Sequence, residues 1–317
     1  MKIPYICFFL LLICCILTHS ELSLYYAFMG LELWYQKMIP TLLPFMILSG
    51  IMIRMELTEG FISFLYPVIR PIYKISRNAC YCLLMGFLCG FPMGAKTVSD
   101  LYSRQMINKR EAEFLLAFCN NIGPVYFVSF VLPLLKRQLL LPYLFGMYGV
   151  PLLYGLILRY TVYRDLPGRT LLSKRNVGSS QELRICDAQT SKSFHLLNVV
   201  DESITSSVQS ILSLGGYMIL FNLLNLLPHI LLGKQPYILA PLLEISGGLN
   251  MLQQNSPLYA LLLLPFGGLS CIAQTNSCIK NTDLSIADYT LHKILLTVLT
   301  AVYYLGWFLL FPRSFMR

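Results

Sequence analysis

The sequence predicts an all-α, polytopic membrane protein made of two related halves that contain broken or re-entrant helices. Of 317 residues, 56% are hydrophobic and only 12% are charged, and the mean hydropathy is +0.64. Soluble domains carry roughly 25% charged residues. Several apolar runs approach the length of about 20 residues that a spanning helix needs. Glycine- and proline-rich interruptions fall inside apolar runs of both halves. We expect about seven to nine membrane segments from these runs.

The net charge of +9 is spread over the connections between apolar runs. It is not gathered on one face, so we expect no nucleic-acid partner. Basic excess in such connections marks cytoplasmic loops. The strongest excess lies between Arg159 and Lys192, with seven basic residues. We therefore interpret 159–200 as a basic cytoplasmic linker between two gate-like membrane halves, 38–158 and 201–317.

The first 30 residues contain an apolar run from Ile3 to Leu17 that follows Lys2. A cleaved signal peptide and an uncleaved membrane helix are the two interpretations. No A-x-A-like cleavage site follows the run, and apolar sequence resumes at Leu22. These features favour an N-terminal membrane helix within 1–30.

The first half continues with an apolar segment from Met38 to Ile53, in which Ser49-Gly50 favours close helix packing. The run from Phe61 to Ile75 is too short and too charged to span, which favours an interfacial or re-entrant segment. Asn108 is a candidate N-cap, with Glu111 as its capping-box partner. Leu139 to Leu158 is an ordinary span.

The second half follows a similar plan. Its amphipathic start, 201–214, has Ile204, Val208, Ile211 and Leu212 at helical spacing. The apolar segments that follow are Gly215-Gly216 to Leu232, Pro241 to Leu252, Leu258 to Ala273 and Leu291 to Phe311.

The interruptions are the strongest functional signal in the sequence. Gly86, Gly90, Pro92 and Gly94 fall inside nine residues, directly before Lys96. In lipid every backbone polar group must be satisfied within the protein, so broken helices occur where the chain is buried or lines a cavity. Interrupted segments in matching positions of two halves point to a transporter's binding site. The candidate substrate-binding residues are Gly90, Pro92, Gly94, Lys96, Asn120, Asn121, Glu244, Gly267, Gly268, Ser270 and Gln274.

Each candidate also has a purely structural interpretation. Lys96 either contacts a ligand or extends its ammonium to the membrane surface. The Asn120-Asn121 amides either bind a solute or join helices, a contribution of about 0.6 kcal/mol in membranes. Ser270 and Gln274 share a helix face and form either a site or a polar helix end. Glu244 is either a proton or cation site within the membrane or a residue at the water boundary. The glycines either shape broken helices or permit close packing.

No catalytic or metal-binding pattern stands out. The sequence lacks G-x-S-x-G, a P-loop and H-E-x-x-H. Most of the ten cysteines lie in apolar segments without a CxxC pair, as expected of small buried hydrophobic residues. We therefore expect neither an enzyme nor a cofactor.

The run from Gly86 to Pro124 resembles the signature of the YlbJ-type sporulation integral membrane proteins. The matching elements are GFPMGAK (Gly90 to Lys96), the Ile107 to Ala112 helix and FCNNIGP (Phe118 to Pro124). A second element, FGGLSCIAQ, covers Phe266 to Gln274, with Pro265 where that family tends to have glycine. The resemblance extends from about Met38 to the end of the chain.

This resemblance implies a nucleoside-recognition or gate domain, an endospore-forming bacterium and a role in spore formation in the cell membrane. It leaves two functions open. One is a transporter or channel for a small polar solute, nucleoside-like or other, and the alternative is a non-transporting scaffold for spore envelope assembly. The expected partners are the lipid bilayer, such a solute and, as an open alternative, further copies of the chain.

Overall fold

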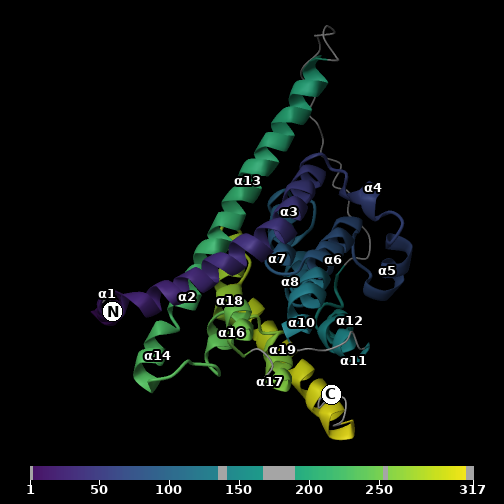
Figure 1. The fold of residues 1–317 in the computed structure, drawn as a ribbon. Helices are drawn as coiled ribbons and strands as arrows, with labels where there is room; N and C mark the ends of the chain where they lie inside the picture. The colour runs from purple at the N-terminus through teal and green to yellow at the C-terminus, as the bar shows by residue number, and fades with distance from the viewer. Residues whose placement is uncertain (1–2, 135–140, 167–189, 253–255, 312–317) are drawn as a thin grey trace.

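The structure, a computed structural model, describes residues 3–134, 141–166, 190–252 and 256–311. All regular elements of these residues are helical, which confirms the predicted all-α membrane fold (Figure 1). Within the described residues, five helices are long and apolar enough to cross a membrane: Ser20–Arg54, Leu141–Thr161, Leu196–Leu232, Pro257–Ile279 and Ile286–Leu310. The shorter apolar helices are Ile3–Thr18, Arg77–Cys89 and Pro124–Leu134.

The helices before the linker are short and often interrupted. In chain order they are α1 (Ile3–Thr18), α2 (Ser20–Leu33), α3 (Ile39–Arg54), α4 (Thr58–Ile62), α5 (Tyr66–Tyr73), α6 (Arg77–Cys89), α7 (Met93–Ser103), α8 (Lys109–Leu116), α9 (Pro124–Tyr126), α10 (Leu132–Leu134), α11 (Leu141–Leu144) and α12 (Val150–Thr161). Three π-helical turns, Trp34–Met38, Phe127–Val131 and Phe145–Gly149, join α2 to α3, α9 to α10 and α11 to α12.

The helices after the linker include the two longest. They are α13 (Thr190–Leu223), α14 (Leu226–Leu232), α15 (Ala240–Leu243), α16 (Ile245–Leu252), α17 (Pro257–Leu263), α18 (Gly268–Ile279) and α19 (Ile286–Leu310). The predicted basic linker lies mostly in 167–189, outside the described residues. The division into two related halves stays a prediction.

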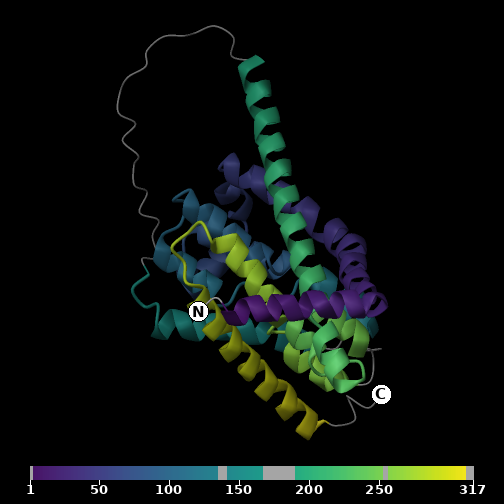
Figure 2. The same ribbon diagram turned by 90° about the vertical axis from the view of Figure 1, so that its left-hand side faces the viewer.

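The long rod of α13 is crossed by α2 and α3 (Figures 1 and 2). Glycines permit these close contacts. A Cβ on Gly30 would lie 2.8 Å from the Met218 carbonyl oxygen, and one on Gly215 would lie 2.5 Å from the Trp34 ring. Trp34 also donates its indole N–H to the Ile211 carbonyl at 2.8 Å.

The amphipathic part of α13 places its polar face inward. Ile204, Val208 and Leu212 are exposed, whereas Ser203 and Ser207 are buried. This is the arrangement expected in lipid, where apolar side chains are favoured on the outside of the bundle and polar side chains face the interior.

Side-chain caps fix where three helices begin. Ser76, Asn108 and Ser285 each accept a hydrogen bond from the backbone N–H three residues on, at 3.2, 2.8 and 3.1 Å. The predicted N-cap at Asn108 is therefore confirmed. The predicted capping-box return from Glu111 is wrong, because its carboxylate accepts from the Ser76 N–H at 2.9 Å and so joins α8 to the start of α6.

Candidate functional site

Two interrupted helices cross in the first half of the chain. One is α6–α7, broken at Gly90 to Pro92, and the other is α8–α9, broken between Leu116 and Pro124. We call this contact the first crossing. The two backbones touch, because a Cβ on Gly86 would lie 2.1 Å from the Cys119 carbonyl oxygen and one on Gly90 would lie 2.3 Å from the Gly123 nitrogen. Gly90 also has φ +86°, a conformation that favours glycine.

The side-chain amides of Asn120 and Asn121 form hydrogen bonds that hold the first crossing together. Asn121 donates its side-chain amide to the Phe118 carbonyl at 2.6 Å, and its own carbonyl accepts from the Phe91 N–H at 2.6 Å. Asn120 donates to the Thr275 hydroxyl and to the Tyr289 hydroxyl, both at 3.0 Å. Asn120 therefore joins the first crossing to α18 and α19. Gly94 packs against the same break, because a Cβ on Gly94 would lie 2.8 Å from the Cys119 carbonyl oxygen.

A buried lysine from α19 contacts the first crossing. Lys293, on α19, is 2% exposed, and its ammonium donates to the Asn120 carbonyl at 2.6 Å. The ammonium also lies 5.4 Å from the centroid of the Phe91 ring. Its ammonium therefore contacts the Asn120 carbonyl inside the break between α8 and α9. Sequence analysis missed Lys293, although a lysine inside a 25-residue apolar helix is a detectable signal.

A second crossing joins α15–α16 to α17–α18. The breaks are Glu244 and residues 264–267. A Cβ on Gly268 would lie 3.0 Å from the Leu243 carbonyl oxygen, and both Gly267 and Gly268 have positive φ, +74° and +78°. The predicted interruption near Gly267 to Ser270 is thus present as a left-handed turn that starts α18.

Glu244 occupies the centre of the second crossing. It is 2% exposed and accepts three hydrogen bonds, from the Ser246 N–H at 3.0 Å, the Gly247 N–H at 2.6 Å and the Asn222 amide at 3.1 Å. Negative charge at the start of a helix is favoured by the helix dipole. No basic group in the described part of the chain lies within 4 Å of this carboxylate.

A polar cavity of about 320 Å³ lies between α7, α13 and α18. It contains three of the predicted residues, Pro92, Lys96 and Gln274. The Lys96 ammonium lies 3.3 Å from the Asp100 carboxylate, so the two charges largely neutralise each other. The remaining polar side chains around it are Ser99, Ser103, Ser206, Gln209, Ser210, Ser213, Tyr217, Ser277, Lys280 and Asn281.

Hydrogen bonds to the helices leave acceptor oxygens facing this cavity. Ser210 donates to the Ser206 carbonyl at 2.8 Å and Ser213 to the Gln209 carbonyl at 3.0 Å. Gln274 donates its amide to the Ser270 hydroxyl at 2.8 Å, which bears out their predicted shared face. Each hydroxyl and amide retains oxygen lone pairs. The cavity therefore suits a solute that donates hydrogen bonds.

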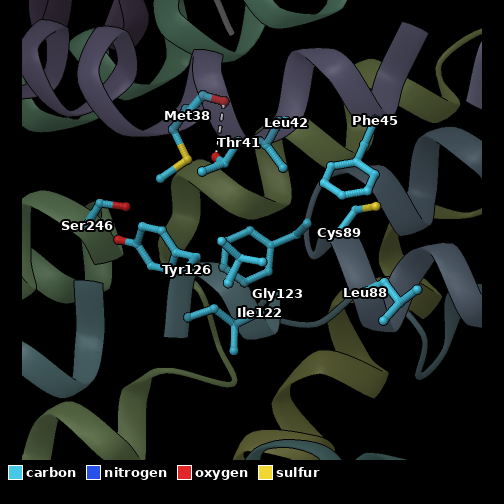
Figure 3. A pocket seen from close by; sticks show the side chains of 12 residues that line it. Met38, Thr41, Leu42, Phe45, Leu88, Cys89, Ile122, Gly123, Tyr126 and Ser246 are labelled. Atoms are coloured by element: carbon cyan, nitrogen blue, oxygen red, sulfur yellow. Dashed lines mark hydrogen bonds between the residues drawn. The ribbon is translucent and has the colours of Figure 1, made fainter. Parts of the chain in front are cut away.

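A second, small and largely apolar cavity has a volume of about 40 Å³ (Figure 3). Its walls come from α3, α6 and α9, with Leu42, Phe45 and Tyr126 among them. Phe91 lines this cavity, whereas the next residue, Pro92, lines the polar one. The tip of the first interrupted helix thus separates the two cavities.

The predicted site residues therefore fall into separate groups. The cavity contains Pro92, Lys96 and Gln274, with Ser270 bonded behind it, whereas Glu244 lies in the second crossing. The glycines and Asn121 belong to the crossings. The serine wall of α13 was missed, although Ser206, Ser210 and Ser213 recur at helical spacing opposite exposed apolar residues. Within the described residues, no cluster of three metal-binding side chains is present.

The chain is similar to one characterised sporulation protein over nearly its whole length. It is 26% identical to the sporulation integral membrane protein YlbJ of Bacillus subtilis (strain 168), over 93% of this chain and 80% of the relative. This similarity supports assignment of the chain to the YlbJ-type family. This similarity and the apolar helices support a multi-pass membrane protein of sporulation in an endospore former. No family model and no solved structure matches the chain.

Proposed function

We propose that this YlbJ-type protein moves a small polar solute across the cell membrane during spore formation. The observation that carries the proposal is the polar cavity of about 320 Å³, which ends at the tip of an interrupted helix. Its size falls in the range of about 300–1,000 Å³ typical of small-molecule sites. Broken helices beside a polar cavity are the usual arrangement of a transporter's binding site.

The Lys96–Asp100 pair favours a neutral or zwitterionic solute, and Lys280 adds one further positive charge to the lining of the cavity. Lys96 and Asp100 form an ion pair within it, and the serine wall of α13 offers acceptor oxygens. A nucleoside or another solute with several N–H or O–H groups can donate hydrogen bonds to the oxygen lone pairs of this wall.

Phe91 is the proposed barrier between the two cavities. Its ring contacts the second crossing, since a Cβ on Gly267 would lie 3.2 Å from it. A solute in the polar cavity meets this bend before it can reach the apolar cavity. The polar cavity also extends to Lys280 and Asn281, at the turn close to Lys109 and Asp283. The basic residues there favour a cytoplasmic location for that end.

A thermal-melt screen of the purified full chain in detergent tests the proposal. The panel contains nucleosides, bases, amino acids and polyols. A solute at 100 times its dissociation constant stabilises the folded state by about 2.7 kcal/mol, so we expect a dose-dependent rise in Tm for one class. Gln274→Ala and Ser210→Ala should weaken that response about tenfold or more. Ser63→Ala, an exposed hydroxyl remote from the cavity, is the control.

Uptake of the same solute into vesicles then tests transport. We expect saturable uptake by the wild-type protein and a faster, poorly selective leak through Phe91→Ala. A flat screen on a well-folded sample would contradict the proposal and favour a scaffold. Asn121→Ala is unsuitable for this test, because Asn121 bonds the break itself.

A further inference from the structure

The exposed face of α5 combines two unpaired cations with a groove between them. Arg70 and Lys74 stand one helical turn apart and, with Pro67 and Pro71, line this groove, which we call the α5 groove. Both basic side chains are exposed. No carboxylate of the described residues lies within 4 Å of either charge.

Aromatic rings hold the cations of this region in place. The Arg70 guanidinium lies 5.7 Å from the centroid of the Tyr66 ring, and that of Arg77 lies 5.4 Å from the same ring. The Lys74 ammonium lies 5.2 Å from the centroid of the Tyr160 ring. Cations over aromatic faces are attracted by the negative charge density of the ring face. In the described residues the Arg70 and Lys74 heads are therefore oriented without an acidic partner, whereas Arg77 also lies 4.0 Å from the Glu59 carboxylate.

The backbone of α5 is fixed to α12. Arg159, which is 4% exposed, donates to the Tyr73 carbonyl at 2.6 Å, and the Tyr160 hydroxyl donates to the Ile72 carbonyl at 3.0 Å. In return, the Tyr73 hydroxyl donates to the Leu152 carbonyl at 2.8 Å. These bonds satisfy carbonyls at the end of α5 and present the groove on a preorganised helix.

Large apolar side chains flank the cations and remain exposed. Phe64 is 87% exposed, Val68 is 63% exposed and Phe61 is 55% exposed. Such side chains beside basic residues are typical of a segment that lies at the surface of a bilayer. A free anion would satisfy the cations but leave these apolar side chains in water, whereas a lipid satisfies both.

We propose that the α5 groove binds the phosphate headgroup of an anionic phospholipid, with Phe64 and Val68 against its acyl chains. Basic pockets at the ends of membrane helices bind such headgroups. The site is remote from the polar cavity, with which it shares no lining residue. Its function does not depend on transport.

Lipid titration of the full chain tests this site. The purified protein in neutral detergent is titrated with phosphatidylglycerol, and bound lipid is counted by native mass spectrometry. We expect Arg70→Gln/Lys74→Gln to weaken binding about thirtyfold, because each cation near an anionic surface contributes about 1 kcal/mol. Phe64→Ser, which keeps both cations, should also weaken binding of the lipid.

The matched control is Arg104→Gln/Lys234→Gln, which removes two exposed cations outside α5 and should leave binding unchanged. Equal binding of phosphatidylcholine, or an equal loss in the control, would overturn the proposal. Full competition by millimolar inorganic phosphate, with Phe64→Ser unchanged, would overturn it in favour of a free-anion site. Unchanged phosphatidylglycerol binding by the double α5 variant overturns it outright.

Discussion

The two helix crossings are completed by opposite charges from different places in the chain. In the first crossing, Lys293 of α19 donates to the Asn120 carbonyl, which lies in the break between α8 and α9. In the second, Glu244 lies inside the break itself and accepts from backbone N–H groups at the start of the next half-helix. Glu244 thus lies where the dipole at the start of α16 favours an acid, whereas Lys293 contacts a carbonyl between two helices. The two charged side chains differ in the number of hydrogen-bonding groups that they contact. Lys293 contacts one carbonyl, and Glu244 accepts from three donors.

Glycines pack closely in both crossings, but the second also has a glycine that meets a side chain. In the first crossing a Cβ on Gly86 would strike backbone, the Cys119 carbonyl oxygen. In the second, a Cβ on Gly247 would strike the Asn222 side-chain oxygen at 1.8 Å. A side chain can move, whereas backbone held in a crossing cannot do so cheaply. Backbone packing is nevertheless present in both crossings, since a Cβ on Gly248 would strike the Pro241 backbone of the second. The second crossing adds the side-chain hydrogen bonds of Glu244 and Asn222 to that packing.

The largest effect is expected from removing Glu244. Glu244→Ala leaves the Ser246 N–H, the Gly247 N–H and the Asn222 amide without their acceptor. Each buried unsatisfied group costs about 1–3 kcal/mol, so we expect a loss of stability of about 3 kcal/mol or more, measured as the fall in Tm in detergent. Glu244→Gln keeps one acceptor oxygen and should recover most of this loss. An alanine variant as stable as wild type would contradict the account of the second crossing.

A smaller effect is expected from Lys293→Met, which has a similar volume. Only the Asn120 carbonyl loses a recorded donor, and removal of a buried ammonium relieves its desolvation. We therefore expect the free energy of unfolding to change by about 1 kcal/mol, measured in the same detergent as the Glu244 variants. A larger loss than in Glu244→Ala would reverse the comparison, because the first crossing would then depend on its cation more than on its backbone contacts.

The contrast also explains what could be predicted from the sequence. Local features are readable because their partners are close along the chain: the interruptions at Gly90 and Gly267, the Asn108 cap, and Ser270 with Gln274. Glu244 stands out for the same reason, as a lone acid in an apolar run. Lys293 contacts a carbonyl 173 residues away, so nothing near it in sequence indicates that partner.

The polar cavity could not be predicted from the sequence for a related reason. Its walls come from α7, α13 and α18, and only the packing of α13 decides which of its faces looks inward. An apolar stripe predicts a buried face in water but an exposed face in lipid. Glu111 shows the same limit, because its carboxylate bonds Ser76 of α6 rather than the cap of its own helix.

The smallest change in stability is expected from removing the ion pair between Lys109 and Asp283, which lies outside the two crossings. The Lys109 ammonium and the Tyr102 hydroxyl each lie 2.7 Å from an Asp283 carboxylate oxygen. These hydrogen bonds lower the pKa of Asp283, first through Lys109 and then through Tyr102, and the bond to Asp283 raises the pKa of Lys109. The pair therefore joins the α7–α8 turn to the α18–α19 turn most strongly when both groups are charged.

The signs of these shifts set the pH window. A lowered folded-state pKa at Asp283 contributes stability above its unfolded value of about 3.9, and this is lost as pH falls through the folded pKa. The Lys109 contribution is present below about 10.4 and is lost as pH rises through its higher folded pKa. Asp283→Asn should thus lower Tm slightly at pH 7, and the difference from wild type should disappear in acid. Because the ion pair is exposed, added salt should also reduce this difference in Tm. Asp201→Asn is the control for removing one exposed carboxylate, and a difference that persists unchanged in acid would exclude the ion pair as its cause.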